Sequence, residues 1–335
     1  MHAELARSGG RITFERFMEL ALYHPQLGYY TTAKQRIGKA GDYFTSVSTG
    51  PLFGRILAKQ FLKWRGELGN PADFEIVEFG GHRGQLRQDV LAATPDLRYR
   101  VVEAGDPLPD SITGVVFSNE FLDALPVHRV KVQNGEWKEV FVAQASSLQP
   151  KGIQNRQDAG SIFSEALGPL SSSRLAEYLH DLPVQLMEGY QTEVNVRAFD
   201  WMEDMAHRLK RGYVLTIDYG YERADYFAPQ HGDGTLLCYH RHTKNTNPFN
   251  NIGEQDITAH VEFTSLIEHG KKFGLEPLLF TDQAHFLLRI GESEIAEIAE
   301  RTAGQLSHER AAIHQLIHPE LMGRAFKVLV QRKRI

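Results

Sequence analysis

A glycine-rich turn with acidic residues on either side lies in the first third of the chain. Residues 74–86 read FEIVEFGGHRGQL, in which an almost continuous apolar run ends at Gly80 and a helix-like segment follows Gly84. Such a run is typical of a parallel strand that is covered on both faces. The free backbone N–H groups of a strand–turn–helix unit commonly bind the polar end of a cofactor. An ordinary turn between a strand and a helix gives the same pattern.

The acids around this turn favour a nucleoside cofactor. Glu78 precedes the turn, and Glu103 follows the next predicted strand, residues 99–102. An acid at the end of the second strand can accept hydrogen bonds from both ribose hydroxyls. The G-x-G-x-x-G of NAD-binding proteins and the Gly-Lys-Ser/Thr ending of a P-loop are both missing from this stretch. Because Glu103 would equally suit an NAD ribose, a nucleotide-dependent oxidoreductase stays an alternative.

A second polar group follows the apolar run at residues 115–117. Asn119 and Glu120 come just past the predicted carboxyl end of this strand, where open α/β sheets bind their ligands. Asp123 is three residues further on, and on a helical turn it would point the same way as Glu120. Paired carboxylates can hold a guanidinium through two hydrogen bonds and orient its nitrogen for attack on a methyl group. The alternative is that Asp123 caps a turn and Glu120 lies at a helix N-terminus.

Two later strands supply further candidates. The predicted strand 213–217 carries Asp218 to the same edge of the sheet. A strand near residues 236–239 would place Cys238, His240 and His242 on one face. A zinc site is disfavoured, because no second Cys/His pair at finger spacing follows and one strand cannot surround a tetrahedral ion. We therefore expect no metal and predict that His242 forms a polar wall of the cleft.

A series of different short motifs extends from about residue 12 to residue 331. They are His24-Pro25-x-x-Gly28-Tyr29-Tyr30, Gly41-Asp42-x-x-Thr45-Ser46, Leu52-Phe53-Gly54, Glu78-x-Gly80-x-x-x-Gly84, Asn119-Glu120-Phe121-Leu122-Asp123-Ala124-Leu125-Pro126, Glu188-Gly189-Tyr190, Glu193-Val194-Asn195, Asp218-Tyr219-Gly220, Gly234-Thr235-Leu236, Gln255-Asp256-Ile257-Thr258-Ala259-His260-Val261 and Met322-Gly323-x-x-Phe326-Lys327-Val328. The chain resembles the S-adenosylmethionine-dependent methyltransferase family that includes the mitochondrial complex I assembly arginine methyltransferase and its MidA-like bacterial branch.

The resemblance implies methyl transfer from S-adenosyl-L-methionine to an arginine nitrogen of a protein, and a respiratory complex I subunit is the acceptor that it suggests. The predicted cofactor-binding residues are Glu78, Gly80, Gly81, His82, Gly84, Glu103, Asn119, Thr45 and Ser46. The predicted catalytic residues are Glu120, Asp123, Glu188 and His242. Glu188 is included because relatives keep such carboxylates near the substrate, although a solvated acid beside a helix gives the same pattern.

His82 departs from the family pattern, which reads GPGRG and has a glycine at this position. A histidine here would adopt a strained left-handed conformation and take space near the methionine part of the cofactor. Residues 104–114 are also a short connection, which predicts that an edge strand and part of the adenine pocket are missing. The main alternative is therefore a catalytically impaired methyltransferase-fold protein that acts as a binding or assembly factor.

The predicted fold is α/β, a Rossmann-like class I methyltransferase sheet with helices on both faces and a final antiparallel strand at 326–330. Residues 1–70 are predicted as an N-terminal helical segment over the cleft, and residues 71–335 as the methyltransferase domain. Insertions at about 143–195 and 220–260 would build the substrate wall. We also predict a hairpin at Asn134-Gly135 and helices at 12–22, 163–179, 196–209 and 261–273, the last capped by Asp256.

Composition limits the kinds of partner that we expect and the cellular compartment. The net charge of −5 gives no broad basic face, so we expect no nucleic acid. A single cysteine, Cys238, allows no internal disulfide and suits a reducing compartment. No apolar run approaches the ~18 residues of a membrane span, and the first residues resemble neither a secretory signal nor a transit segment. We therefore expect a cytoplasmic protein whose oligomeric state is open.

Overall fold

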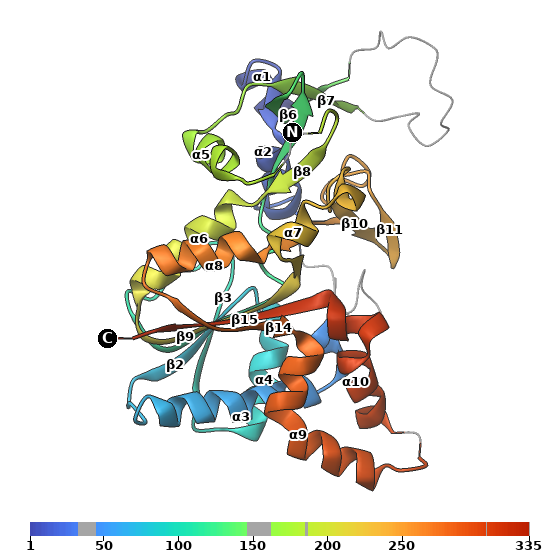
Figure 1. Ribbon diagram of the computed structural model, residues 1–335. Coiled ribbons are helices and arrows are strands. Elements are labelled where there is room, and N and C mark those ends of the chain that lie inside the picture. Colours follow the sequence, from blue (N-terminus) through green and yellow to red (C-terminus); the bar gives the residue numbers. More distant parts are fainter. Residues whose placement is uncertain (33–44, 146–161, 185–186, 306, 335) are drawn as a thin grey trace.

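A seven-stranded sheet is the centre of the larger half of the molecule (Figure 1). The computed structural model describes residues 1–32, 45–145, 162–184, 187–305 and 307–334. The strands of this sheet are β2 (Phe74–Phe79), β3 (Arg98–Val102), β4 (Ile112–Asn119), β9 (Leu209–Tyr221), β13 (Val261–Glu262), β14 (Glu276–Asp282) and β15 (Phe326–Lys333). Their order is β14-β15-β9-β4-β2-β3, and β13 pairs with the end of β9. Only β15 runs antiparallel to its neighbours, which confirms the predicted fold class.

In the described part of the chain, β3 is the outermost strand on its side of the sheet. Residues 103–111 alone connect it to β4, and Glu103 and the next few residues are exposed. The predicted lack of a further edge strand is therefore confirmed for the described residues. The loss of part of the adenine pocket stays a prediction.

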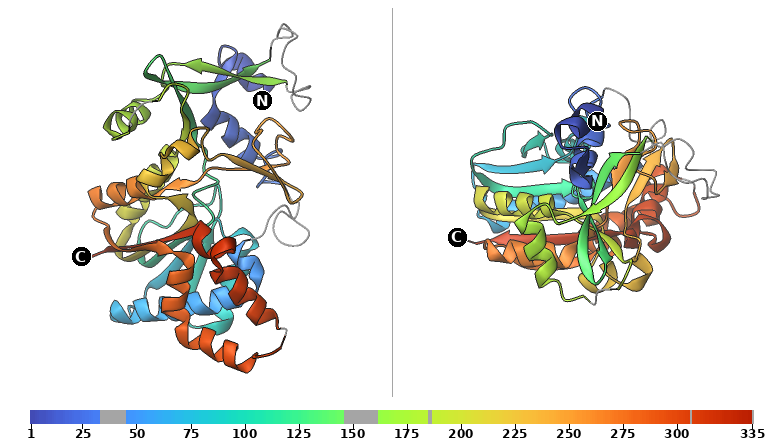
Figure 2. Two further views of the ribbon diagram at one scale, coloured as in Figure 1. Left: turned by 45° about the vertical axis from the view of Figure 1, so that its right-hand side comes forward. Right: turned by 90° about the horizontal axis from the view of Figure 1, so that it is seen from above.

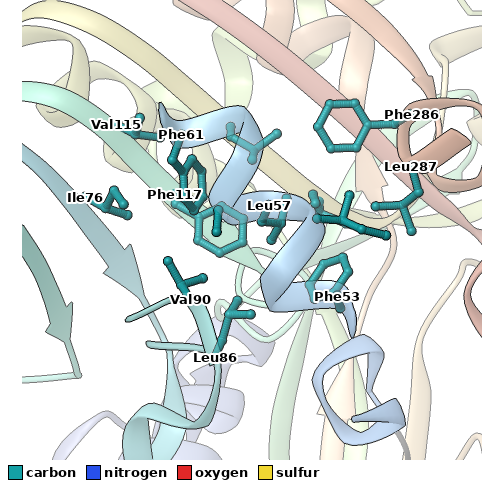
Figure 3. Close-up of a cluster of buried hydrophobic side chains, with 14 of the residues drawn as sticks. Phe53, Leu57, Phe61, Ile76, Leu86, Val90, Val115, Phe117, Phe286 and Leu287 are labelled. Carbon is teal, nitrogen blue, oxygen red and sulfur yellow. The ribbon is translucent and has the colours of Figure 1, made fainter. Parts of the chain in front are cut away.

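Helices cover both faces of the large sheet. Successive residues of a strand point to opposite faces, so neighbouring apolar residues join different cores. Ile76 joins a core with α3, α4, α9 and α10, whereas Val77 joins a core with α6 and α8. Figure 3 shows the first of these cores, in which Phe61 of α3 lies against Phe117 of β4. These helices are α3 (Leu52–Glu67), α4 (Gln85–Ala93), α6 (Val196–Arg208), α8 (Phe263–Lys272), α9 (Gln283–Arg301) and α10 (His308–Ile317). A π-helical turn, η4 (Pro319–Gly323), leads into β15.

A smaller antiparallel sheet forms the other half of the molecule (Figure 1). Its strands are β1 (Arg11–Thr13), β5 (His128–Gln133), β6 (Glu136–Gln144), β7 (Phe163–Gly168) and β8 (Gln191–Val194). The helices of this half are α1 (His2–Arg7), α2 (Phe14–Tyr23) and α5 (Ser173–Asp181). The predicted hairpin is confirmed, with positive φ at both Asn134 and Gly135. The helix predicted at 163–179 is partly wrong, because residues 163–168 pair with β6 and the helix begins only at Ser173.

The second insertion contributes a three-stranded sheet made of β10 (Leu237–His240), β11 (Thr243–Asn245) and β12 (Asp256–Thr258). Two short helical segments, α7 (Arg223–Tyr226) and η3 (Pro229–His231), precede it. Helix α8 is capped by Glu262, which accepts from Thr264 N–H at 2.8 Å and Ser265 N–H at 3.0 Å. The predicted cap, Asp256, instead lies in β12, so that prediction was wrong.

Residues 1–70 do not pack as one segment. Helix α2 begins as predicted, where the Thr13 side chain accepts a hydrogen bond from Arg16 N–H, and β1 pairs with β6 of the small sheet. Helix α3 instead packs on the large sheet, because its apolar face matches that of β2 and β4. Figure 2 shows α1 and α2 at one end of the molecule and α3 at the other. Within the described ranges, every helix is too short or too polar to cross a lipid bilayer.

The centre of the sheet depends on two glycines that face each other. Gly114 of β4 pairs with Gly212 of β9, and both have φ near +140°. A Cβ on Gly212 would lie 2.0 Å from the Gly114 carbonyl oxygen. We expect Gly212→Ala to lower the free energy of unfolding by more than about 2 kcal/mol in urea denaturation. Gly66→Ala is the matched control, because nothing lies within 4 Å of that position in α3. Equal stability of the two variants would contradict this account.

Candidate cofactor and catalytic site

The turn after β2 is shaped by residues that adopt positive φ. Gly80, His82 and Gly84 have φ of +69°, +34° and +68°. A Cβ on Gly80 would come within 2.8 Å of the Phe121 ring, so a larger residue would not fit there. The left-handed conformation predicted for His82 is confirmed. Its backbone N–H hydrogen-bonds to the carboxylate of Glu103, which joins the glycine turn to the end of β3.

Glu78 lies beneath the same turn. Its side chain is 2% exposed, and Oε2 has no hydrogen-bond partner in the described part of the chain. A Cβ on Gly81 would lie 2.6 Å from this oxygen, so the glycine is needed for the close approach. Burial raises the pKa of Glu78 to about 8, and the nearby charge of Glu103 adds to the rise. A buried carboxylate oxygen without a hydrogen-bond partner, next to a glycine turn, is suited to receive a polar ligand.

The second group lies at the end of β4. The Glu120 carboxylate accepts hydrogen bonds from Ser46 N–H at 3.2 Å and from the Asn119 side-chain amide at 3.0 Å. Thr45 caps the short turn η1 (Ser46–Thr49) by accepting from Ser48 N–H. The described contacts therefore place Ser46 and Asn119 against Glu120. Thr45 precedes Ser46 in the chain. Whether Thr45, Ser46 and Asn119 also touch the cofactor stays a prediction.

The segment after Glu120 is not the predicted helical turn. Glu120 itself has φ of +52°, and residues 121–123 lie in an irregular loop. The Asp218 carboxylate at the end of β9 accepts from the backbone N–H groups of this loop, at 3.2 Å from Phe121, 2.8 Å from Leu122 and 3.3 Å from Asp123. These bonds satisfy N–H groups that the first turn of a helix would have left without an intrahelical partner.

Four carboxylates lie close enough to affect one another. Burial raises the pKa of Glu120 to about 8, and Asp218 and Asp256 push it in the same direction. Burial also raises the pKa of Asp123 well above its usual range, with further contributions from Asp218, Glu120 and Asp256. The pKa of Asp218 is raised by burial, although its backbone hydrogen bonds oppose the rise. The site therefore favours a cation, which would compensate these charges.

Residues from the small half of the molecule reach this cluster. The Tyr30 hydroxyl donates to Asp256 at 2.8 Å, and the Tyr23 hydroxyl donates to the Ala124 carbonyl at 3.0 Å. Sequence reasoning gave neither tyrosine a role and treated Asp256 only as a helix cap. The one available signal was that Tyr30 and Asp256 both belong to motifs that carry the family resemblance.

Two predicted catalytic residues lie elsewhere. Glu188 is exposed, and its carboxylate accepts from Asn134 N–H at 3.1 Å and Gly135 N–H at 3.3 Å, so it caps the hairpin of the small sheet. His242 is exposed in the turn after β10, where Arg241 and His242 both have positive φ. This turn ends the alternation that placed Cys238, His240 and His242 on one face, so that prediction was wrong. No contact in the described residues brings Glu188 or His242 to Glu120.

The residues at the carboxyl edge fit a nucleoside cofactor. Glycines allow close approach at the turn, Glu78 offers an unpaired buried oxygen, and Glu103 lies at the end of the second strand. The carboxylates of Glu120 and Asp123 lie one strand further along the sheet. A nucleoside that carries a reactive group would thus extend from the first turn toward the carboxylates after β4, which is the arrangement of a class I methyltransferase.

Comparisons with known proteins agree with this class. The family described as S-adenosyl-L-methionine-dependent methyltransferases matches residues 99–281. A Burkholderia thailandensis protein with bound S-adenosyl-homocysteine is 32% identical, with a TM-score of 0.85 over 99% of this chain and 90% of that one. The mitochondrial protein arginine methyltransferase NDUFAF7 homolog of Drosophila melanogaster is 26% identical over 96% of this chain and 82% of its own length. The Homo sapiens protein of the same name is 25% identical over 96% and 80%.

The chain belongs to this family of S-adenosyl-L-methionine-dependent methyltransferases. The predicted enzyme class and cofactor are therefore confirmed. The same comparisons contradict the predicted cytoplasmic location, because the curated relatives from Drosophila melanogaster and Homo sapiens are both named as mitochondrial. That expectation had rested on the amino-terminal residues and the single cysteine, which say little about compartment.

We expect the two sides of the first turn to have opposite effects on cofactor affinity. Glu103→Ala removes a charged acceptor and should weaken binding of S-adenosylmethionine by ~1.5–3 kcal/mol in titration calorimetry. His82→Gly removes a side chain from the turn and allows the positive φ without strain, so it should tighten binding. Unchanged affinity in Glu103→Ala would remove Glu103 from the site. If wild type and His82→Gly both gave no heat at millimolar cofactor, the methyltransferase site would be disproved.

The raised pKa of Glu120 predicts a pH dependence of stability. Between its usual value of 4.5 and the folded value of about 8, the folded protein binds more protons than the unfolded chain. The free energy of unfolding therefore falls as pH rises through this window. Glu120→Gln should flatten the fall, as measured by urea denaturation at pH 5.5 and 8.5. Glu136→Gln is the control. Lys138 lowers the pKa of that exposed carboxyl, so its titration affects stability only below this pH window. Parallel curves for wild type and Glu120→Gln would contradict the assignment.

Proposed function

We propose that the protein transfers a methyl group from S-adenosylmethionine to an arginine nitrogen of another protein. Two relatives that span most of this chain are named protein arginine methyltransferases, which supports the acceptor. A subunit of respiratory complex I is the acceptor suggested by resemblance, and it stays a prediction.

The observation that carries the proposal is the group of carboxylates around Glu120. Burial is the largest cause that raises the pKa of Glu120 and of Asp123, and the charges of Asp218 and Asp256 raise both further. A guanidinium group is planar, stays charged and donates in a fork that matches carboxylates. Its entry would offset the repulsion and restore the charged form of Glu120. A neutral acceptor would leave that repulsion in place.

The chemistry asks mainly for alignment and exclusion of water. Bound S-adenosylmethionine would supply the methyl group and leave as S-adenosylhomocysteine. Glu120 and Asp123 would hold the guanidinium through its N–H groups, so that the remaining nitrogen faces the methyl group. The proton lost from that nitrogen passes to solvent after transfer. Glu120 is fixed for this role by Ser46 N–H and the Asn119 amide.

The acceptor can be identified by its chemistry. Purified protein is incubated with methyl-labelled S-adenosylmethionine and a protein extract, and the labelled proteins are hydrolysed to amino acids. We expect the label in methylated arginine. Label in lysine, in a carboxyl ester or only in small molecules would overturn the arginine proposal. Transfer to no acceptor, with normal cofactor binding, would favour the alternative of a binding or assembly factor.

Glu120→Gln tests the role of the carboxylate in the same assay. We expect turnover to fall by more than ~10-fold while the affinity for S-adenosylmethionine stays nearly unchanged, which marks an interaction made in the reacting complex. Glu188→Gln is the matched control, because that carboxylate caps an exposed hairpin and should leave turnover intact. Loss of cofactor affinity together with turnover would argue against the assigned role.

A further inference from the structure

Asp218 accepts four hydrogen bonds, all of them from backbone N–H groups. Its Oδ2 accepts from three consecutive residues, Phe121, Leu122 and Asp123, and its Oδ1 accepts from Tyr219 N–H at 2.9 Å. The residue is 0% exposed. Three successive N–H groups directed at one oxygen are rare outside helix N-termini and anion-binding loops.

These bonds join two neighbouring strands of the large sheet at their carboxyl ends. Asn119, the last residue of β4, is paired with Ile217, and Glu120 N–H donates to the Ile217 carbonyl at 2.9 Å. The next three N–H groups bind Asp218 itself. The loop that follows β4 is thus fastened to β9 along every residue from Glu120 to Asp123.

Other elements donate hydrogen bonds to the carbonyl oxygens of the same loop. The Asn195 side chain donates to the Leu122 carbonyl at 2.8 Å, and Ala259 N–H donates to the Asp123 carbonyl at 2.9 Å. No other described contact satisfies the N–H groups of Phe121 to Asp123. Without Asp218 these three buried donors would therefore lose their partner, and the loop would have to rearrange.

We propose that Asp218 is a positioning residue for methyl transfer, which acts by holding the loop of Glu120 and Asp123 in the geometry that receives the acceptor. The inference rests on the proposed function of those two carboxylates. A carboxylate is required because an amide has one acceptor oxygen. In Asp218→Asn, the amide nitrogen must face either the three loop donors or Tyr219 N–H, and both are donors.

Hydrogen exchange measures the bonds directly. In the full chain, we expect the amides of Phe121, Leu122 and Asp123 to exchange at least about tenfold faster in Asp218→Asn than in wild type, and faster still in Asp218→Ala. Glu262→Gln is the matched control, since this buried carboxylate also accepts two backbone N–H groups but serves α8. It should speed exchange at Thr264 and Ser265 only. Unchanged exchange at residues 121–123 in Asp218→Asn would overturn the proposal.

Turnover separates positioning from a merely structural role. We expect Asp218→Asn to lower methyl transfer by about 10- to 100-fold, while the dissociation constant of S-adenosylhomocysteine changes less than about threefold. Glu262→Gln should keep wild-type turnover even if its melting temperature falls as far. Equal losses of turnover in both variants, or a parallel loss of cofactor affinity, would overturn the role of Asp218. If wild type itself labels no arginine, the proposed function fails, whereas the exchange experiment still reports whether Asp218 holds the loop.

Discussion

The parallel pairing of β3, β2, β4 and β9 is the constraint on which the rest of the site depends. Parallel strands must end at the same edge, so Glu78, Glu103, Asn119 and Asp218 are brought together although they are far apart in the chain. The close contact of Gly114 and Gly212 keeps β4 and β9 in register near their start. At the other end, the same register puts Asn119 opposite Ile217 and lets Asp218 reach the next loop.

Burial of acidic groups at this edge is costly and therefore informative. A core that only had to be stable would not place Glu120, Asp123, Asp218 and Asp256 near one another, because Asp218 and Asp256 raise the pKa of both Glu120 and Asp123. Asp218 accepts four backbone N–H groups, whereas the Glu120 carboxylate accepts one backbone N–H and one side-chain amide, and burial raises the pKa of both. The difference in partners distinguishes the acid that is bonded to the loop from Glu120, which we propose as a ligand of the acceptor.

The small half of the molecule supports the site from the opposite side. Its helix α2 supplies Tyr23, whose hydroxyl bonds to Ala124, and the segment after α2 supplies Tyr30, which bonds to Asp256. Asn195 both caps α6 and donates to the Leu122 carbonyl. The small half therefore does more than enlarge the protein, because it provides hydrogen bonds that the large sheet cannot make to this region.

The sequence by itself determined the large sheet, its glycine turn and the acids at its edge. Apolar runs at β2, β4 and β9 are strong signals of buried strands, and the residues that follow each run must meet when the strands are parallel. The sequence also determined the Asn134-Gly135 hairpin, because few dipeptides accept positive φ twice. Tertiary structure alone decided that residues 163–168 extend the small sheet, since their pattern also suits a helix and only pairing with β6 selects a strand. It likewise placed Glu188 and His242 at exposed turns and gave Asp218 its three loop donors. These outcomes depend on contacts between residues distant in the chain, which local periodicity does not encode.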